Sequence, residues 1–171
     1  SMGNLKLMRG EPAAALRPIR APMAARAPTP RILFDLGLAL NALNQHQKAL
    51  DSFDLAIQLQ PDFFEAHGNR GAMLAALGQH GDAIESYRKA LAIRPDFADA
   101  HCNLGSALTQ LQRYDEALAS LDRALALRAD YPDALYNRGN ALKPLQRYAE
   151  ALASYDRAIA LQPNHAAAHN N

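Results

Sequence analysis

The sequence predicts an all-α protein, a right-handed superhelical α-solenoid in which helix–turn–helix units stack on one another. The first observation is a repeat of 34 residues that runs through most of the 171-residue chain. Glycine recurs at this spacing at Gly37, Gly71, Gly105 and Gly139. The second is the composition: alanine and leucine dominate, aromatic residues make up 6% and tryptophan is absent, which favours helices over β-sheet. One helix pair of this size cannot bury its apolar face, so neighbouring units must pack together.

Residues 1–29 are predicted to form a degenerate repeat or an irregular N-terminal cap. Gly10 and Ile19 fall in the register of the later units. Pro18 and Pro22, however, would lie inside the second helix of such a unit. They would interrupt it, because proline lacks the N–H that the helix needs.

Four regular units follow, at residues 30–63, 64–97, 98–131 and 132–165. In the second unit the apolar spacing predicts helices over residues 64–77 and 81–94, joined by a turn at Gly78. Small residues such as Gly71 and Ala83 would let the two helices approach closely, and Tyr87 would fill the gap that remains.

Local signals predict how some of these helices begin and end. Asp62 and Glu65 have the spacing of an N-cap residue and a carboxylate that reaches back to it. Pro144 lies near the end of the first helix of the fourth unit. We expect a local irregularity there, because proline removes a hydrogen bond and biases Lys143 away from helical angles.

The last six residues, 166–171, are expected to begin a fifth unit. The second helix of the fourth unit, over about residues 150–161, carries Leu152, Tyr155 and Ile159 on its apolar face. In a stack, a following unit would cover part of that face, and an uncovered apolar patch favours association. Self-association through this C-terminal end is therefore also expected.

The repeat resembles that of the tetratricopeptide repeat (TPR) family. The family pattern is a large residue, then Leu-Gly, a further large residue, and later Ala, an aromatic residue, Ala and Pro. In the first unit it is matched by Leu33, Leu36, Gly37, Leu40, Ala49, Phe53, Ala56 and Pro61. The resemblance covers about residues 30–165. Arg70 and Arg138 depart from it in the leucine position, and His67 and His101 in the leading large position.

The sequence offers no pattern typical of catalysis or of metal binding. Its one cysteine, Cys102, excludes an internal disulfide framework and a multi-cysteine zinc site. The six histidines follow the repeat and are interpreted as structural. No GxGxxG, P-loop or GxSxG motif occurs. We therefore expect no enzymatic activity, no metal and no cofactor.

Charge and hydropathy exclude further classes of partner. Eighteen Lys and Arg residues balance 17 Asp and Glu, which argues against a nucleic-acid binder. No apolar run approaches the ~20 residues that span a membrane. Arg17, Arg20 and Arg26 interrupt the only candidate for a secretory signal, so we expect a cytoplasmic protein. An arginine-rich, acid-poor N-terminus is also typical of organelle import signals.

One polar column on the first helices is not needed by the core. It holds Asp35, Asn69, Asn103, Asn137 and Asn171. An amide both donates and accepts hydrogen bonds, so a ladder of amides can pair with the backbone of an extended peptide. The alternative interpretation is a structural amide that caps or bridges neighbouring helices. The column looks like the asparagine ladder of O-GlcNAc transferases and similar TPR arrays, which implies peptide recognition by its four asparagines. Asp35 breaks that pattern in the first unit.

Other residues are expected to line the same concave groove. They are Glu65, Asp99, Asp133, Tyr136, Asn140 and Cys102. The chaperone-binding TPR subclass holds a C-terminal carboxylate with lysines and arginines in this groove. The corresponding positions here hold Phe34, Leu38, Asn69, Asp99 and Asn103, so this partner class is rejected.

Two functions remain open from the sequence. The first is a scaffold that binds an extended peptide or protein segment in its concave groove. The second is the substrate-recruiting TPR region of a larger enzyme, such as an O-GlcNAc transferase-like glycosyltransferase. A purely structural oligomerisation spacer is a third class, favoured if the inner face binds nothing.

Overall fold

The computed structural model describes residues 26–162, in which every regular element is a helix and short turns and irregular segments join the helices. The helices are α1 (Pro30–Ala42), α2 (His46–Leu59), α3 (Phe64–Ala76), α4 (His80–Ile93), α5 (Ala98–Gln110), α6 (Tyr114–Leu127), α7 (Pro132–Leu142), the 3₁₀ helix η1 (Lys143–Leu145) and α8 (Tyr148–Leu161). The predicted all-α solenoid is confirmed. The two helices predicted for the second unit match α3 and α4 to within one residue at each end.

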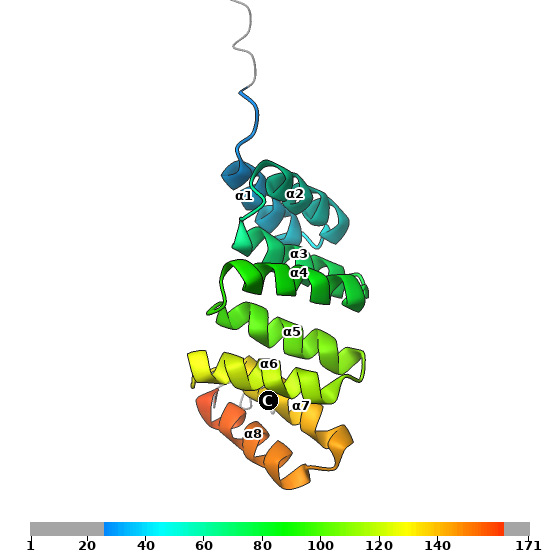
Figure 1. Cartoon of the computed structure of the whole chain (residues 1–171), viewed down its shortest axis with the longest axis vertical. Helices are drawn as coiled ribbons and strands as arrows, with labels where there is room; N and C mark the ends of the chain where they lie inside the picture. The colour runs from blue at the N-terminus through cyan, green and yellow to red at the C-terminus, as the bar shows by residue number, and fades with distance from the viewer. Residues whose placement is uncertain (1–25, 163–171) are drawn as a thin grey trace, which may run out of the picture.

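The helices follow one another in chain order along an elongated molecule, from α1 at one end to α8 at the other (Figure 1). Each odd-numbered helix packs against the helix that follows it, and each pair packs on the next pair. Successive first helices also contact one another, α3 with α5 and α5 with α7. The first helices therefore line the inner side of the stack, and the second helices line the outer side.

The recurring glycine of each first helix has no side chain, which lets the two helices of a unit approach closely. A Cβ atom on Gly37 would lie 2.5 Å from the Phe53 ring, and one on Gly71 would lie 2.6 Å from the Tyr87 ring. Gly105 and Gly139 meet Leu121 and Tyr155 in the same way. The predicted pairing of a small residue with a bulky one is thus confirmed in every unit.

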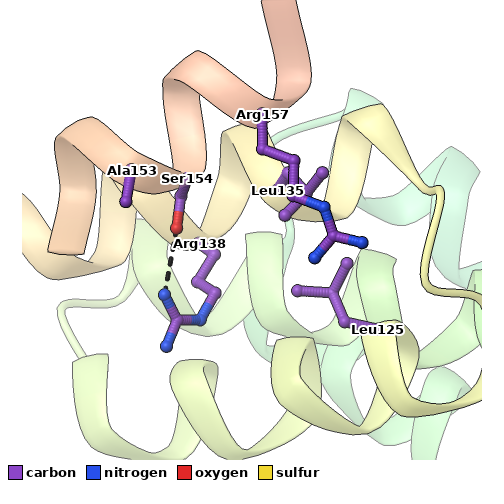
Figure 2. A pocket seen from close by; sticks show the side chains of 6 residues that line it. All are labelled: Leu125, Leu135, Arg138, Ala153, Ser154 and Arg157. Atoms are coloured by element: carbon purple, nitrogen blue, oxygen red, sulfur yellow. Dashed lines mark hydrogen bonds between the residues drawn. The ribbon is translucent and has the colours of Figure 1, made fainter. Parts of the chain in front are cut away.

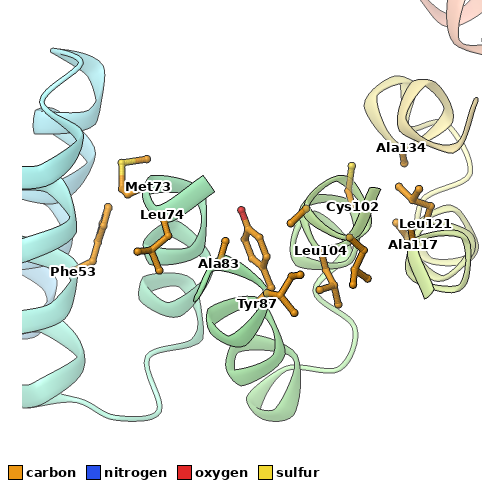
Figure 3. Close-up of a cluster of buried hydrophobic side chains, with 14 of the residues drawn as sticks. Phe53, Met73, Leu74, Ala83, Tyr87, Cys102, Leu104, Ala117, Leu121 and Ala134 are labelled. Atoms are coloured by element: carbon orange, nitrogen blue, oxygen red, sulfur yellow. The ribbon is translucent and has the colours of Figure 1, made fainter. Parts of the chain in front are cut away.

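The core is one continuous cluster that runs through all four units, from Leu33 to Ala151. Figure 3 shows its middle section, with Phe53, Tyr87 and Leu121 each inserted between helices. These three side chains are at most 2% exposed. Because consecutive units share this core, each unit depends on its neighbours for burial.

The helix starts differ from the sequence prediction. No side chain caps α3, which begins at Phe64 with Phe63 in the capping position. The capping role predicted for Asp62 is therefore wrong, because Asp62 lies one residue too far from the helix. Asp96, which precedes α5 by the same distance, lies 3.8 Å from Arg94 and does not cap α5 either.

The irregularity predicted at Pro144 is confirmed. α7 has 11 residues where α5 has 13, and the chain continues as the 3₁₀ helix η1. Lys143 nevertheless keeps right-handed helical angles, with φ −55° and ψ −52°. The predicted bias of Lys143 is therefore wrong, since the chain accommodates the proline by tightening the last turn.

Two arginines in the leucine position of the repeat form links between units. The Nε atom of Arg138 donates to Asp122 Oδ1 in the preceding unit at 2.8 Å, and Nη1 donates to Ser154 Oγ at 3.0 Å. Figure 2 shows Arg138 reaching Ser154 beside a hollow on α6, α7 and α8. Arg70 repeats the arrangement with Asp54 and Ser86, at 2.6 Å each.

Candidate functional site

The inner face carries a row of three adjoining hollows. The first, of about 320 Å³, lies between α3, α4 and α5 and includes Asn103, Ser106 and Gln110. The second, of about 310 Å³, lies between α5 and α7 and shares Ser106 and Gln110 with the first. The third, of about 400 Å³, shares Tyr136 and Asn140 with the second and extends to α8. Shared walls make these hollows one continuous track across three units.

The predicted amide column lies along this track, but its members differ in their surroundings. Asn103 is exposed and lines the first hollow, and Asn137 is half-buried and lines the second. Asn137 Nδ2 also donates to Cys102 Sγ at 3.6 Å, which links α7 to α5. Asn69 Nδ2 donates to the Glu65 carbonyl one turn earlier in α3, at 2.9 Å. Within the described part of the chain, the amides of Asn69 and Asn137 are hydrogen-bonded, whereas that of Asn103 is not.

The first and last members of the column fall outside this pattern. Asp35 forms an exposed ion pair with Arg31 on α1, with 3.2 Å between Asp35 Oδ1 and Arg31 Nε. Asn171 lies outside the described residues. The structure therefore brings Asn103 and Asn137 together along the track and leaves Asp35 at the N-terminal end.

Tyr136 and Asn140 lie together between the second and third hollows. The Tyr136 side chain is 57% exposed, and its ring centroid lies 5.9 Å from that of Tyr155. The Tyr155 hydroxyl donates to Asn140 Oδ1 at 2.7 Å, so this amide is partly engaged in holding α8 to α7. Tyr136 remains free to offer an aromatic surface to a ligand.

The acidic residues expected at the groove edge play different parts. Asp99 Oδ1 accepts a hydrogen bond from the Tyr131 hydroxyl at 2.8 Å and lies 3.2 Å from Arg128 Nη1. Glu65 is half-buried and Asp133 is exposed. Asp99 thus ties the start of α5 to the segment that follows α6 in the same unit, whereas Asp133 is exposed to solvent.

Cys102 does not line the groove surface, in contrast to the sequence prediction. The residue is only 2% exposed and lies in the junction between α5 and α7. Burial raises the pKa of the Cys102 thiol, and the nearby charges of Asp133 and Asp99 raise it further, while hydrogen bonds to Tyr131 and Asn137 lower it. The thiol is therefore protonated at neutral pH and is a poor nucleophile. The repeat register placed Cys102 on the inner helix, but only the packing of α7 shows that it is covered.

Three polar residues of the track were missed by the sequence analysis: Ser106, Thr109 and Gln110. Together with the amides they give the track hydroxyl and amide groups that both donate and accept. Ser106 and Gln110 lie three and seven residues after Asn103 and so share its side of α5, and Thr109 lies beside Gln110 at the edge of that side. Helical spacing from Asn103 is the signal that could have found them.

The histidines of the described residues contact the backbone or the core. His67 Nε2 lies 2.8 Å from the Pro61 carbonyl oxygen, and His101 Nε2 makes the same contact with Pro95. The Nδ1 atoms of His46 and His80 are enclosed with no hydrogen-bond partner in the described part of the chain. Within residues 26–162, no group of three His, Cys, Asp or Glu side chains could hold a metal ion. None of the helices described is long and apolar enough to span a membrane.

Comparison with known families identifies the repeat. The family described as "Tetratricopeptide repeat" matches residues 1–62 and 132–165, and the family described as "TPR repeat" matches residues 71–110 and 105–146. The chain belongs to the tetratricopeptide repeat family. The match over residues 1–62 includes the stretch 1–29, most of which lies outside the described residues together with 166–171.

Several solved structures share this TPR fold. A crystal structure of MamA is 26% identical, covers 75% of each chain and has a TM-score of 0.69. MamA from residue 41 to its end, from Desulfovibrio magneticus RS-1, is 23% identical over 78% of this chain and 76% of that chain, with a TM-score of 0.71. The first TPR domain of Spaghetti (RPAP3), bound to the HSP90 peptide SRMEEVD, is 19% identical over 69% and 94%, with a TM-score of 0.68. A search of curated protein sequences finds no match.

Proposed function

We propose that this TPR chain is a protein–protein interaction scaffold that binds an extended polypeptide segment along the inner face of α3, α5 and α7. The observation that carries the proposal is the continuous track of three hollows. Its walls hold amide and hydroxyl groups, including Asn103, Ser106, Gln110 and Asn137. Such groups pair with a peptide backbone, which an extended segment exposes at every residue.

The track lacks the cationic clamp that would hold a C-terminal carboxylate. The RPAP3 domain is bound to a peptide with three acidic residues, SRMEEVD. Here the residues expected at the carboxylate-binding positions include Asn69, Asp99 and Asn103, and none is cationic. Lys143, in the third hollow, is the one charged side chain other than histidine that lines the track. A single lysine does not make a carboxylate clamp, so the polar, mostly uncharged lining favours a segment that is bound through its backbone.

These residues are proposed to bind and not to catalyse. The same track would serve an independent scaffold or the substrate-recruiting part of a larger enzyme, as the resemblance to O-GlcNAc transferase arrays implies. Both versions predict binding by the isolated chain. A cytoplasmic location without nucleic-acid or membrane partners remains part of this proposal.

The test is a peptide selected from a random library against the whole chain, followed by titration calorimetry. We expect Asn103→Ala with Asn137→Ala to weaken binding of the selected peptide by about 30-fold, since each amide–backbone bond contributes on the order of 1 kcal/mol net. The control pair is Gln47→Ala with Gln58→Ala on the outer helix α2, which should leave the affinity unchanged. Equal affinity of the wild type and the Asn103, Asn137 double variant would show that the amides are structural.

A further inference from the structure

The side of α8 where a following unit would pack is apolar, like the buried sides of α4 and α6, but it is exposed. Leu152 is 61% exposed and Ile159 is 59% exposed. The residue at the position of Leu152 in α6 is Leu118, which is 6% exposed, and in α4 it is Ile84, which is 1% exposed. α4 and α6 each pack against the first helix of the following unit, whereas no described helix follows α8. The face of α8 is therefore shaped to receive a first helix.

The internal junctions show which side of a first helix fits there. In α7, Arg138 contacts α6, and Ala134 and Ala141 share its side of the helix because they lie four residues before it and three after it. Ala134 and Ala141 have no exposed surface, and Arg138 bonds Asp122 on α6. In α3 the same positions hold Ala66, Arg70 and Met73, and Arg70 bonds Asp54 on α2.

α1 presents an apolar stripe at these same three positions. They hold Ile32, Leu36 and Ala39, all of which are exposed. The exposed fractions of Ile32 and Leu36 are 58% and 47%. Within residues 26–162, α1 thus exposes the first-helix side of a unit junction, and α8 exposes the second-helix side.

We propose that copies of this chain associate head to tail, with α1 of one copy packed on α8 of the next in the geometry of the internal junctions. The occupant is a second copy because the two exposed stripes are the two halves of an interface that the molecule builds three times within itself. Such a contact joins different surfaces and need not close, so it builds linear assemblies. This inference does not rest on the proposed peptide binding, but a second copy on α8 would cover Ile159, which also lines the third hollow of the track.

A leucine of the incoming helix would lie opposite a charged residue of α8, as already happens at one junction inside the molecule. Asp156 on α8 occupies the position of Asp54 and Asp122, and it would lie opposite Leu36 of the second copy. Inside the molecule, Leu104 lies opposite a charged residue in the same way, because Arg88 occupies this position on α4. Arg88 directs its charge to Glu85 and Glu116.

Sedimentation analysis of the whole chain over a wide concentration range tests the proposal. We expect the average mass to rise past that of a dimer without a plateau. Leu152→Lys and Ile32→Lys should each weaken association roughly tenfold or more, since a charge replaces an apolar contact. The matched control is Leu55→Lys, at an exposed position of α2 where the later units carry Lys89, Arg123 and Arg157.

Two further experiments distinguish head-to-tail contact from other modes of association. An equimolar mixture of the Leu152→Lys and Ile32→Lys variants should form dimers and stop there, because each pair retains only one intact junction. Leu36→Arg should strengthen association, because it would pair with Asp156 as Arg138 pairs with Asp122. A monomer at every concentration, or a dimer that Ile32→Lys leaves intact, would overturn the proposal.

Discussion

One residue in the turn of each unit takes a left-handed backbone conformation. These residues are Asn44, Gly78, Gln112 and Gln146, with φ between 56° and 77°. Asn44 and Gly78 suit that conformation and mark the turn in the sequence, whereas glutamine gives no such signal. The pairing of Gly71 with Tyr87 was predictable because both recur in register. The bond between Asn137 and Cys102 was not, because it depends on a cysteine that occurs once.

Replacing Gln112 with glycine should stabilise the fold. Glycine removes the steric cost of the left-handed conformation, so we expect the free energy of unfolding to rise by roughly 0.5–1 kcal/mol. Gly78 already adopts this conformation at the equivalent position, with φ 77°. Chemical denaturation is the measurement, and Gln58→Gly in the last turn of α2 is the control, expected to lower stability by up to about 1 kcal/mol. If Gln112→Gly lowers the free energy of unfolding, the Gln112 side chain stabilises the fold by more than its left-handed backbone conformation destabilises it.

Neighbouring units pack through a position of the first helix that alternates between leucine and arginine along the chain. Arg70 and Arg138 each face an aspartate of the preceding unit. At the junction between them Leu104 faces Arg88. The sequence showed these arginines only as departures from the repeat pattern. Their partners lie 16 residues away on a different helix, so the stack had to be built before the pairs could be recognised.

Arg138 is therefore predicted to couple energetically to Asp122. Arg138→Leu should lower the free energy of unfolding by about 1–2 kcal/mol, because it leaves the Ser154 hydroxyl, in a residue only 4% exposed, without its donor. Adding Asp122→Arg copies the junction of Arg88 with Leu104 and should recover part of that loss. A double-mutant cycle by chemical denaturation measures the coupling. Strictly additive effects would show that the two residues act independently.

The whole molecule is a stack whose inner side gathers polar groups from three units. The solenoid and the inner position of the first helices followed from the 34-residue spacing, because periodic packing leaves few other arrangements. The amide column also followed from the spacing. The spacing could not show which amides are free, because Asn69 and Asn137 make contacts that depend on local side-chain geometry. Asn103 and Tyr136 are the members of the site that keep their surfaces available.

The measurement that tests the central claim most directly is an NMR titration of the whole chain with the selected peptide, following the side-chain amide signals. We expect shifts for Asn103, Gln110 and Asn137, which line the track, and none for Gln47 and Gln58 on the outer helix α2. Shifts confined to Gln47 and Gln58, with the signals of Asn103 and Asn137 unchanged at saturation, would contradict binding along the inner face.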